Sequence, residues 1–216
     1  MNAAVRAVAR CGAARGWRVL GALDGYDGLV EGRFRELTRT VPGGLSVDPE
    51  VDVAASLGGT VLGSARSVRF RTPEGRATAA DRMRAHDGLI VIGGDGSLTG
   101  AHLFAGEHGT RVVGIPASID NDIGCTMALG VDSALNTIVQ ACDRISDTAR
   151  SHRRAFVVEV MGRHSGYLAM ASAIAAAADG VLIREQGRSE EQIVEATAGL
   201  IASAFARAAT NGACSS

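Results

Sequence analysis

The chain has 216 residues, of which 46% are hydrophobic and 21% are charged, so it has enough apolar side chain for a packed core and lacks the composition of a disordered protein. Its 22 basic and 23 acidic residues leave a net charge of −1, and this balance creates no overall field that would hold nucleic acid or an anionic membrane surface. We therefore expect neither kind of partner, and any anion has to be bound by a local group of residues.

Helix and strand patterns alternate along most of the chain. Helical periodicity, or in one case an alanine-rich run, predicts helices at 2–15, 77–86, 98–108, 131–151, 167–178 and 190–208. Short apolar runs predict strands at 17–23, 88–92, 111–115, 155–160 and 180–183. Residues 24–75 are rich in turn-forming residues and are expected to be mostly loop, and 209–216 are expected to form a frayed tail.

The predicted strands are apolar throughout, which is typical of a parallel sheet covered by helices on both faces. The sequence thus predicts an α/β fold with a Rossmann-like parallel sheet. Ligands of such sheets bind at the carboxyl ends of the strands. Three polar or glycine-bearing segments follow predicted strands directly, and we expect them to converge on one crevice: 93–97, 116–122 and 161–166.

Cysteine usage and apolar runs bear on where the protein works. No C-x-x-C pair and no metal-like spacing with histidine occurs among the four cysteines, Cys11, Cys125, Cys142 and Cys214. The most apolar run, 168–178, is too short to span a bilayer. Residues 1–16 lack the continuous apolar stretch of a secretory signal and fit an amphipathic helix better than a transit peptide. We expect reduced thiols in a cytoplasmic protein.

The segment Gly93–Ser97 combines glycines with one carboxylate. Without Cβ atoms, glycines let backbone N–H groups approach phosphate oxygens, and the N-terminus of a following helix favours negative charge. The carboxylate of Asp95 suits Mg²⁺. Glycine-rich turns also occur in many α/β proteins for backbone reasons alone, so this segment by itself leaves both interpretations open.

Acidic and basic side chains supply the remaining candidates. In Ser118–Asp122, one of the two carboxylates could take a proton from an attacking hydroxyl while the other helps to place metal or water, and a plain polar turn is the alternative. Arginines bind phosphate groups bidentately and keep their charge, although exposed arginines are commonly only solvated. The candidate arginines are Arg66, Arg71, Arg154 and Arg163, with His164 beside the last.

Taken together and in this order, three segments resemble the phosphofructokinase family: Gly-Gly-Asp-Gly-Ser at 93–97, Ser-Ile-Asp-Asn-Asp at 118–122, and Arg154 followed, after six intervening residues, by Met-Gly-Arg-His-Ser-Gly at 161–166. The similarity runs through nearly the whole chain, including Met-Asn-Ala-Ala at 1–4, Asp-Gly-Tyr at 24–26, Leu-Gly-Ser-Ala-Arg at 62–66 and Asp-Ser-Ala-Leu at 132–135. The resemblance implies the fold and activity of an ATP-dependent 6-phosphofructokinase, a glycolytic kinase that uses Mg²⁺ and moves the γ-phosphoryl group of ATP to the 1-hydroxyl of fructose 6-phosphate. It also implies an ATP- and Mg²⁺-binding domain at 1–125 and part of the fructose 6-phosphate domain at 126–216.

The resemblance further implies roles for single residues. Asp120 matches the catalytic base, Asp122 a supporting carboxylate, Arg66 a stabiliser of the transferring charge, and Asp95 a magnesium ligand. The positions that match ATP contacts are Arg66, Arg71, Gly94, Asp95, Gly96 and Ser97. Those that match the sugar-phosphate site are Ser118, Ile119, Asp120, Arg154, Met161, Gly162 and Arg163. The arginine matching Arg154 reaches the site of a neighbouring subunit, so a homo-oligomer with shared active sites, a homotetramer, is expected.

Departures from the family pattern keep alternatives open. Family members place a strand and a glycine-rich loop before the segment that matches Met1, and further strands after the last predicted helix, so the chain is expected to be incomplete at both ends. A catalytically incompetent fragment or regulatory subunit is therefore one alternative. A pyrophosphate-dependent enzyme is another, but such enzymes carry aspartate at Gly96 and lysine at Ala117, and both positions here favour ATP. Arg6 and Arg10 match an effector site, while Ser146 replaces an effector arginine.

Overall fold

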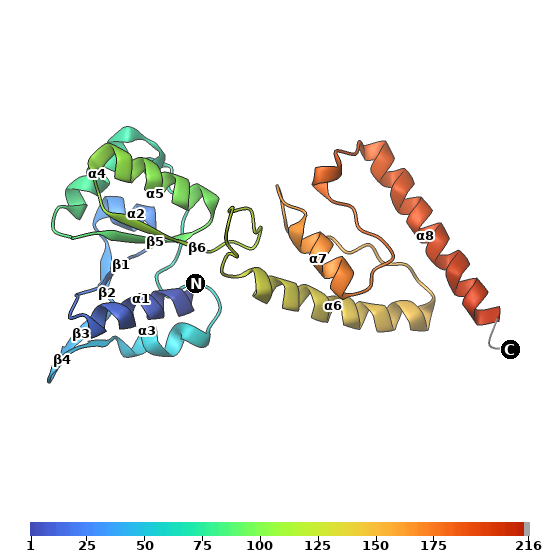
Figure 1. Ribbon diagram of the computed structural model, residues 1–216, viewed down its shortest axis with the longest axis horizontal. Helices are drawn as coiled ribbons and strands as arrows, with labels where there is room; N and C mark the ends of the chain where they lie inside the picture. Colours follow the sequence, from blue (N-terminus) through green and yellow to red (C-terminus); the bar gives the residue numbers. More distant parts are fainter. Residues whose placement is uncertain (214–216) are drawn as a thin grey trace. The chain divides into compact units, whose positions relative to one another are not determined.

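The computed structural model describes the backbone of residues 1–213 and the side chains of residues 1–207. The chain forms two compact units, Met1–Ala117 and Ser118–Ser216. The first is drawn from blue to green in Figure 1 and the second from yellow-green to red. Each unit is described by itself below.

Helices and short strands alternate in the first unit. Its helices are α1 (Asn2–Ala14), α2 (Tyr26–Glu31), α3 (Pro49–Val53), α4 (Pro73–Met83) and α5 (Asp95–His108), with 3₁₀ turns η1 (Ala54–Ser56) and η2 (Arg69–Arg71). Its strands are β1 (Leu20–Ala22), β2 (Phe34–Glu36), β3 (Thr38–Val41), β4 (Gly44–Val47), β5 (Leu89–Gly93) and β6 (Val112–Pro116).

The strands of this unit pair in twos. The β1–β2 and β3–β4 pairs are antiparallel, and β5 and β6 are parallel, with Leu89 opposite Val112 and Gly93 opposite Pro116. Helix α5 connects the two parallel strands, as a parallel pair requires a crossover (Figure 1). Consequently the end of β5 and the start of α5 share the edge of the sheet at which α/β proteins bind ligands.

Two clusters of buried side chains hold the first unit together. One joins α2, η2, α4 and α5 through Leu29, Val30, Phe70, Ala79, Met83 and Phe104. The other joins α1, α3 and the segment between β2 and β3 through Val5, Ala9, Leu37 and Val51. Leu89 packs against the first cluster and Ile92 against the second, so both ends of β5 are fixed to the core.

The second unit is mostly helical. It contains α6 (Val131–His152), α7 (Tyr167–Ala175), the 3₁₀ turn η3 (Arg184–Gln186) and α8 (Glu190–Ala213). Helices α6 and α7 pack together (Figure 1) around a small cluster formed by Ala128, Val131 and Leu168. Helix α6 starts after Gly130, at φ 109°, and ends at Arg153, at φ 51°, so residues in the left-handed region delimit it at both ends.

The α/β class predicted from the sequence is confirmed, but the parallel sheet is smaller than expected. Residues 155–160 and 180–183 are not strands, and within the described residues no backbone pairs with them. Apolar composition gives a segment the preference for a strand, whereas the strand itself needs a hydrogen-bonded neighbour. Instead, Phe156, Val157 and Val158 are exposed.

Several boundaries also differ from the prediction. The loop-rich region 24–75 also contains α2, α3 and β2–β4, which were not predicted. The strand expected at 17–23 is limited to Leu20–Ala22, where β2 provides its partner. The last helix runs on through 209–213, which were expected to fray, and 214–216, including Cys214, lie outside the described residues. Among the residues that the structure describes, none of the helices has the length and apolar content that crossing a membrane requires.

Candidate active site

The predicted nucleotide loop is mainly the first turn of α5. Strand β5 ends at Gly93 and α5 begins at Asp95, earlier than the predicted start at Leu98. The carbonyl oxygen of Gly94 accepts hydrogen bonds from the N–H groups of Ser97 and Leu98, at 3.0 and 3.1 Å. A helix leaves its first N–H groups without intrahelical partners, and here they accompany the exposed Asp95 and Gly96. This helix end therefore offers N–H donors and one carboxylate at the carboxyl end of β5.

Tyr26 fixes this helix start from another part of the sequence. Its hydroxyl donates a hydrogen bond to the carbonyl oxygen of Ser97 at 2.6 Å. Its ring stacks on Phe70, with 3.8 Å between the centroids and 5° between the planes. Burial raises the pKa of Tyr26 to about 12, so the hydroxyl keeps its proton at neutral pH. The first turn of α5 is thus tied to both α2 and η2.

Arg66 and Arg71 flank Phe70 in the sequence, and both are exposed. Within the described residues, neither guanidinium group forms an ion pair or a hydrogen bond. The backbone that carries Arg71 is nevertheless fixed, because the buried Arg76 donates to the carbonyl oxygens of Phe70 and Arg71 at 3.2 and 2.8 Å. The charges of both arginines are thus uncommitted, and Arg71 is on a segment whose backbone is held in place.

Arg76 is itself held by Glu107 of α5. Nε and Nη2 of Arg76 donate to the two carboxylate oxygens of Glu107 at 2.6 and 2.8 Å, which is a bidentate pair. The hydrogen bond from Arg76 is the main cause that lowers the pKa of Glu107. This pair anchors η2 to α5, and with Tyr26 it joins the predicted nucleotide segments into one packed structure.

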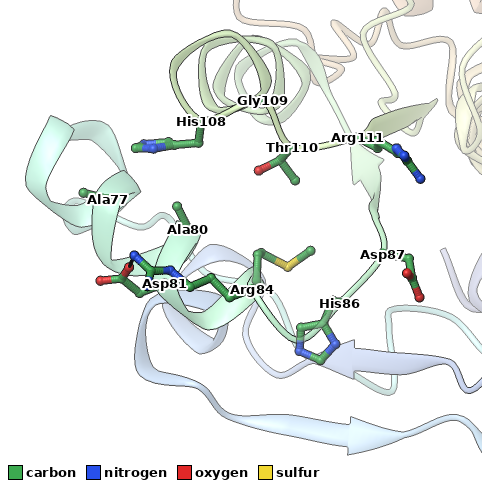
Figure 2. Close-up of a pocket in the computed structure, with 11 residues that line it drawn as sticks. Ala77, Ala80, Asp81, Arg84, His86, Asp87, His108, Gly109, Thr110 and Arg111 are labelled. Carbon is green, nitrogen blue, oxygen red and sulfur yellow. Dashed lines mark ion pairs between the residues drawn. The ribbon is translucent and has the colours of Figure 1, made fainter.

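A cavity of about 550 Å³ lies elsewhere in this unit. Figure 2 shows it between the carboxyl-terminal parts of α4 and α5, with Ala77 and Ala80 on one side and His108 and Thr110 on the other. Its lining residues precede β5 and β6, at the edge of the parallel pair opposite Gly93. The cavity therefore does not coincide with the predicted nucleotide site.

The second unit carries the predicted acidic loop. The hydroxyl of Ser118 accepts a hydrogen bond from the N–H of Asp120 at 3.2 Å, and Asn121 adopts a left-handed φ of 52°. Asp120 is half-buried and Asp122 is exposed. Ile119, between Ser118 and Asp120, packs against the cluster formed by Ala128, Val131 and Leu168. The loop is therefore anchored by one apolar side chain next to the predicted base.

The Met161–Gly166 loop is anchored on the same cluster. Val160, directly before Met161, packs against it as Ile119 does. Gly162 has φ 143°, and a Cβ at this position would lie 2.3 Å from the carbonyl oxygen of Ser165, so only glycine fits this turn. Two loops from distant parts of the sequence, each with predicted sugar-phosphate contacts, are thus attached to one small core.

Arg154 lies far from these loops. Its N–H bonds the carbonyl oxygen of Ala149 just beyond the end of α6, whereas the cluster lies at the start of that helix. Helix α6 has 22 residues and is therefore roughly 33 Å long. Arg154 and Asp120 of one chain consequently do not share a site.

Comparisons with known proteins identify the family of the chain. The family model described as phosphofructokinase matches residues 1–208. The chain belongs to the phosphofructokinase family. It is 50% identical over 188 residues to the ATP-dependent 6-phosphofructokinase of Thermotoga neapolitana, covering 86% of this chain and 56% of that protein. It is 46% identical over 198 residues to ATP-dependent 6-phosphofructokinase 2 of Bacteroides thetaiotaomicron, covering 90% and 58%.

A solved phosphofructokinase shows the same fold. The crystal structure of the Pichia pastoris enzyme in the T-state superposes with a TM-score of 0.73 at 42% identity, covering 83% of this chain and 20% of that one. The chain spans little more than half the length of the curated phosphofructokinases it matches. The phosphofructokinase fold inferred from the sequence motifs is therefore confirmed.

Sequence reasoning missed other residues that hold the candidate nucleotide segments in place. Tyr26 was part of a matching motif but had no assigned role, and Phe70, Arg76 and Glu107 had none. The alternation of Arg69, Phe70 and Arg71 could have indicated a turn with one buried aromatic side chain between exposed arginines. Nothing in the spacing indicates the partners that these side chains contact.

Proposed function

We propose that this chain contributes the nucleotide site and part of the sugar-phosphate site of an ATP-dependent 6-phosphofructokinase. The observation that carries the proposal is the attachment of the Asp120 loop and the Met161–Arg163 loop to one cluster, in a chain of this family. The two groups of candidate residues belong to different units, which supports a nucleotide domain followed by a sugar-phosphate domain. We propose these domains near 1–125 and 126–216, with Ser118–Asp122 belonging to the second unit. The reaction transfers the γ-phosphoryl group of ATP to the 1-hydroxyl of fructose 6-phosphate.

The nucleotide half is supported by the first turn of α5. Its N–H groups suit the phosphates of ATP, with Gly94, Gly96 and Ser97 as contacts. Arg66 and Arg71 have uncommitted charges for the same phosphates, and Arg66 would stabilise the charge that develops on the transferring group. Each role depends on backbone that Tyr26 and Arg76 hold in place.

Asp95 fits a magnesium ion held mainly by the nucleotide. Mg²⁺ is commonly bound through one or two carboxylates together with substrate phosphates. Asp95 offers one exposed carboxylate at the helix start, and the described residues contain no cluster of acidic, histidine or cysteine side chains that would enclose a metal. When bound, the ion would neutralise negative charge on the β- and γ-phosphates.

Asp120 is the proposed general base. It takes the proton of the 1-hydroxyl as that oxygen forms a bond to the γ-phosphorus, while the bond between the γ-phosphorus and the bridging oxygen of ADP breaks. Its backbone bond to Ser118 and the anchoring of Ile119 orient the carboxylate. Asp122 is a supporting carboxylate in the same turn.

Fructose 6-phosphate would be held by Ser118, Ile119, Met161, Gly162 and Arg163. Arg154 would act on the site of a neighbouring copy, since α6 separates it from Asp120 by about the length of the helix. This distance supports a homo-oligomer with shared sites, for which we propose a homotetramer working in cytoplasmic glycolysis.

ATP rather than pyrophosphate is the proposed phosphoryl donor. A Cβ at Gly96 would meet no atom within 4 Å, so the space beside the first turn of α5 is open to a nucleotide. An aspartate at this position would place a negative charge in that space.

The test is an assay of fructose 1,6-bisphosphate formation by the purified chain, run in parallel with ATP and with pyrophosphate. ATP-dependent formation that is lost in Asp120→Asn and kept in Asp147→Asn supports the proposal, because Asp147 only pairs with Arg150 on the surface of α6. A second arm fuses the chain to the part of the Thermotoga neapolitana protein that it does not match. Absence of product in both arms would refute the proposal and favour a non-catalytic subunit. Formation with pyrophosphate alone would reverse the donor assignment.

A further inference from the structure

Two adjacent side chains of η3 reach back to the loop that precedes α7. Oε1 of Glu185 accepts a hydrogen bond from the N–H of Gly166 at 2.7 Å. Nη1 of Arg184 donates to the carbonyl oxygen of Arg163 at 2.8 Å and lies 2.8 Å from Nδ1 of His164. The backbone is therefore held at both ends of Arg163–Gly166 by consecutive residues about twenty positions away.

The backbone of the loop at Gly166 packs directly against Ile183 and Glu185. A Cβ at the buried Gly166 would lie 2.5 Å from Cβ of Ile183 and 2.6 Å from Oε2 of Glu185. Distances under about 3 Å between such atoms require one of them to move, so glycine is the residue that allows this approach. The contact of Glu185 with Gly166 is thus built into the packing and is more than a surface hydrogen bond.

The carboxylate of Glu185 also occupies the N-terminus of α7. Gly166 is the N-cap of this helix and has no side chain with which to cap it. The hydrogen bond from the Gly166 backbone is the main cause that lowers the pKa of Glu185, so Glu185 is ionised at neutral pH. A negative charge at a helix N-terminus is favourable. The oxygen that accepts the hydrogen bond of the Gly166 N–H also occupies the place that a phosphate oxygen would need.

The position of the Glu185 carboxylate determines which group of this loop can bind a phosphate. A free helix N-terminus is a ready site for phosphate, but the N-terminus of α7 already has its anion. Within the described residues, the guanidinium group of Arg163 forms no ion pair or hydrogen bond, whereas its carbonyl oxygen is held by Arg184. The guanidinium group of Arg163 is therefore the positively charged group of this loop that can bind a phosphate.

We propose that Arg184 and Glu185 are positioning residues for the sugar-phosphate loop: they fix the backbone from Arg163 to Gly166, so that the phosphate of fructose 6-phosphate is met by Arg163 and not by the N-terminus of α7. The inference rests on the proposed function and assigns residues that neither the family motifs nor the spacing indicated. Arg184 and Glu185 themselves touch neither reacting group.

The test compares Glu185→Ala, Glu185→Gln and Arg184→Ala in the full chain. Glutamine keeps an acceptor for the N–H of Gly166 and removes the charge, whereas alanine removes both. Glu191→Ala is the matched control, because Glu191 is also an exposed carboxylate with a lowered pKa, held by Ser189 at the start of α8. We expect backbone hydrogen exchange at Gly166 to rise about tenfold in Glu185→Ala and to stay at the wild-type rate in Glu191→Ala.

Binding and kinetics then separate positioning from stability. Glu185→Ala and Arg184→Ala should each weaken binding of fructose 6-phosphate by about tenfold, raising its KM while leaving kcat and the KM for ATP within about twofold. Glu185→Gln should restore binding to within about twofold of wild type, which a loss of folding would not allow. Unchanged hydrogen exchange across α6 checks that the fold of the second unit is kept.

The outcomes distinguish this inference from the proposed function. Absence of fructose 6-phosphate binding by the wild-type chain, both alone and fused to the remaining part of the Thermotoga neapolitana protein, refutes the proposed function, and the positioning role is refuted with it. Wild-type binding together with unchanged affinity in both alanine variants overturns the inference alone. A Glu185→Gln variant as weak as Glu185→Ala would also overturn it, since the charge and not the positioning bond would then matter.

Discussion

The two units hold their candidate site residues in different ways. In the first unit, side chains far apart in sequence are joined by buried contacts, such as Tyr26 to Ser97 and Arg76 to Glu107. In the second, the candidate loops rest on a cluster of three buried residues and on contacts from neighbouring loops. Many large apolar side chains in the second unit stay exposed, among them Val157, Met161, Ile174 and Val194.

This difference predicts which substitutions should disturb each group of candidate residues. The nucleotide residues depend on a core that many side chains build together, so they should tolerate single changes in loops and fail when the core is damaged. The sugar-phosphate residues depend on turn geometry and on a few hydrogen bonds, so they should respond to single changes nearby without global unfolding.

Asp120→Asn should separate chemistry from nucleotide binding most sharply. In any preparation that phosphorylates fructose 6-phosphate, kcat should fall by roughly 10² to 10⁴, because a general base contributes about that much. The affinity for ATP should stay within about twofold, since the nucleotide residues belong to the first unit. Steady-state kinetics and ATP titration measure the two quantities. A variant with near-normal kcat would remove Asp120 from the role of base.

Leu29→Ala and Leu168→Ala compare the two cores with the same substitution. Both leucines are 1% exposed, but Leu29 belongs to the larger cluster of the first unit and Leu168 to the three-residue cluster of the second. We expect a loss of about 4 kcal/mol in unfolding free energy for Leu29→Ala and about 2 kcal/mol for Leu168→Ala, since the cost depends on how far the surroundings can collapse. Urea unfolding monitored separately in each unit measures both. Equal losses would contradict the contrast between the units.

The same contrast explains what the sequence could and could not predict. Strand β5, helix α5 and strand β6 were predicted because their apolar runs and periodicity are local properties. The start of α5 was placed too late, because aspartate, glycine and serine favour turns as well as first helical turns. Residues 155–160 were predicted as a strand from composition alone, which does not provide the partner that a strand needs.

From the sequence, only those residues of the candidate site that belong to its motifs could be predicted. Asp95, Asp120 and Arg163 stand out by type and by place after a predicted strand. The residues that position them do not, because their partners lie far along the chain: 71 positions separate Tyr26 from Ser97 and 19 separate Gly166 from Glu185. No local pattern contains these pairs, so they emerge only from the packed structure.

Gly96→Asp should affect the nucleotide half alone. The open space beside Gly96 would admit the new side chain without a clash, so folding should be unchanged. The added charge should oppose the phosphates of ATP and lower kcat/KM for ATP by about tenfold, with the KM for fructose 6-phosphate kept. Gly106→Asp, on an equally open position of the same helix away from its start, is the control. Unchanged kcat/KM for ATP in Gly96→Asp would show that the first turn of α5 does not bind the phosphates of ATP.

Tyr26→Phe should have the smallest effect, a small loss of unfolding free energy that is specific to the packing of the first unit. Loss of the hydrogen bond to the carbonyl oxygen of Ser97 should lower the unfolding free energy at neutral pH by about 1 kcal/mol, while the ring keeps its stacking on Phe70. The wild-type protein should behave differently at alkaline pH. Burial raises the pKa of Tyr26 from 10.0 to about 12, so the unfolded chain releases this proton more readily than the folded one. The associated stability is therefore complete below pH 10 and is lost as the pH rises from 10 through 12.

Phenylalanine has no proton to release, so Tyr26→Phe should show a shallower decline in stability between pH 10 and 12, and the two proteins should approach each other in that range. Urea unfolding at closely spaced pH values measures the decline. Tyr167→Phe is the matched control, because Tyr167 is the other tyrosine of the chain and lies in α7 of the second unit. It retains Tyr26 and should keep the steep alkaline loss. Parallel curves for Tyr26→Phe and wild type would mean that Tyr26 is not buried as the structure shows it, and the link between α2 and the nucleotide turn would have to be abandoned.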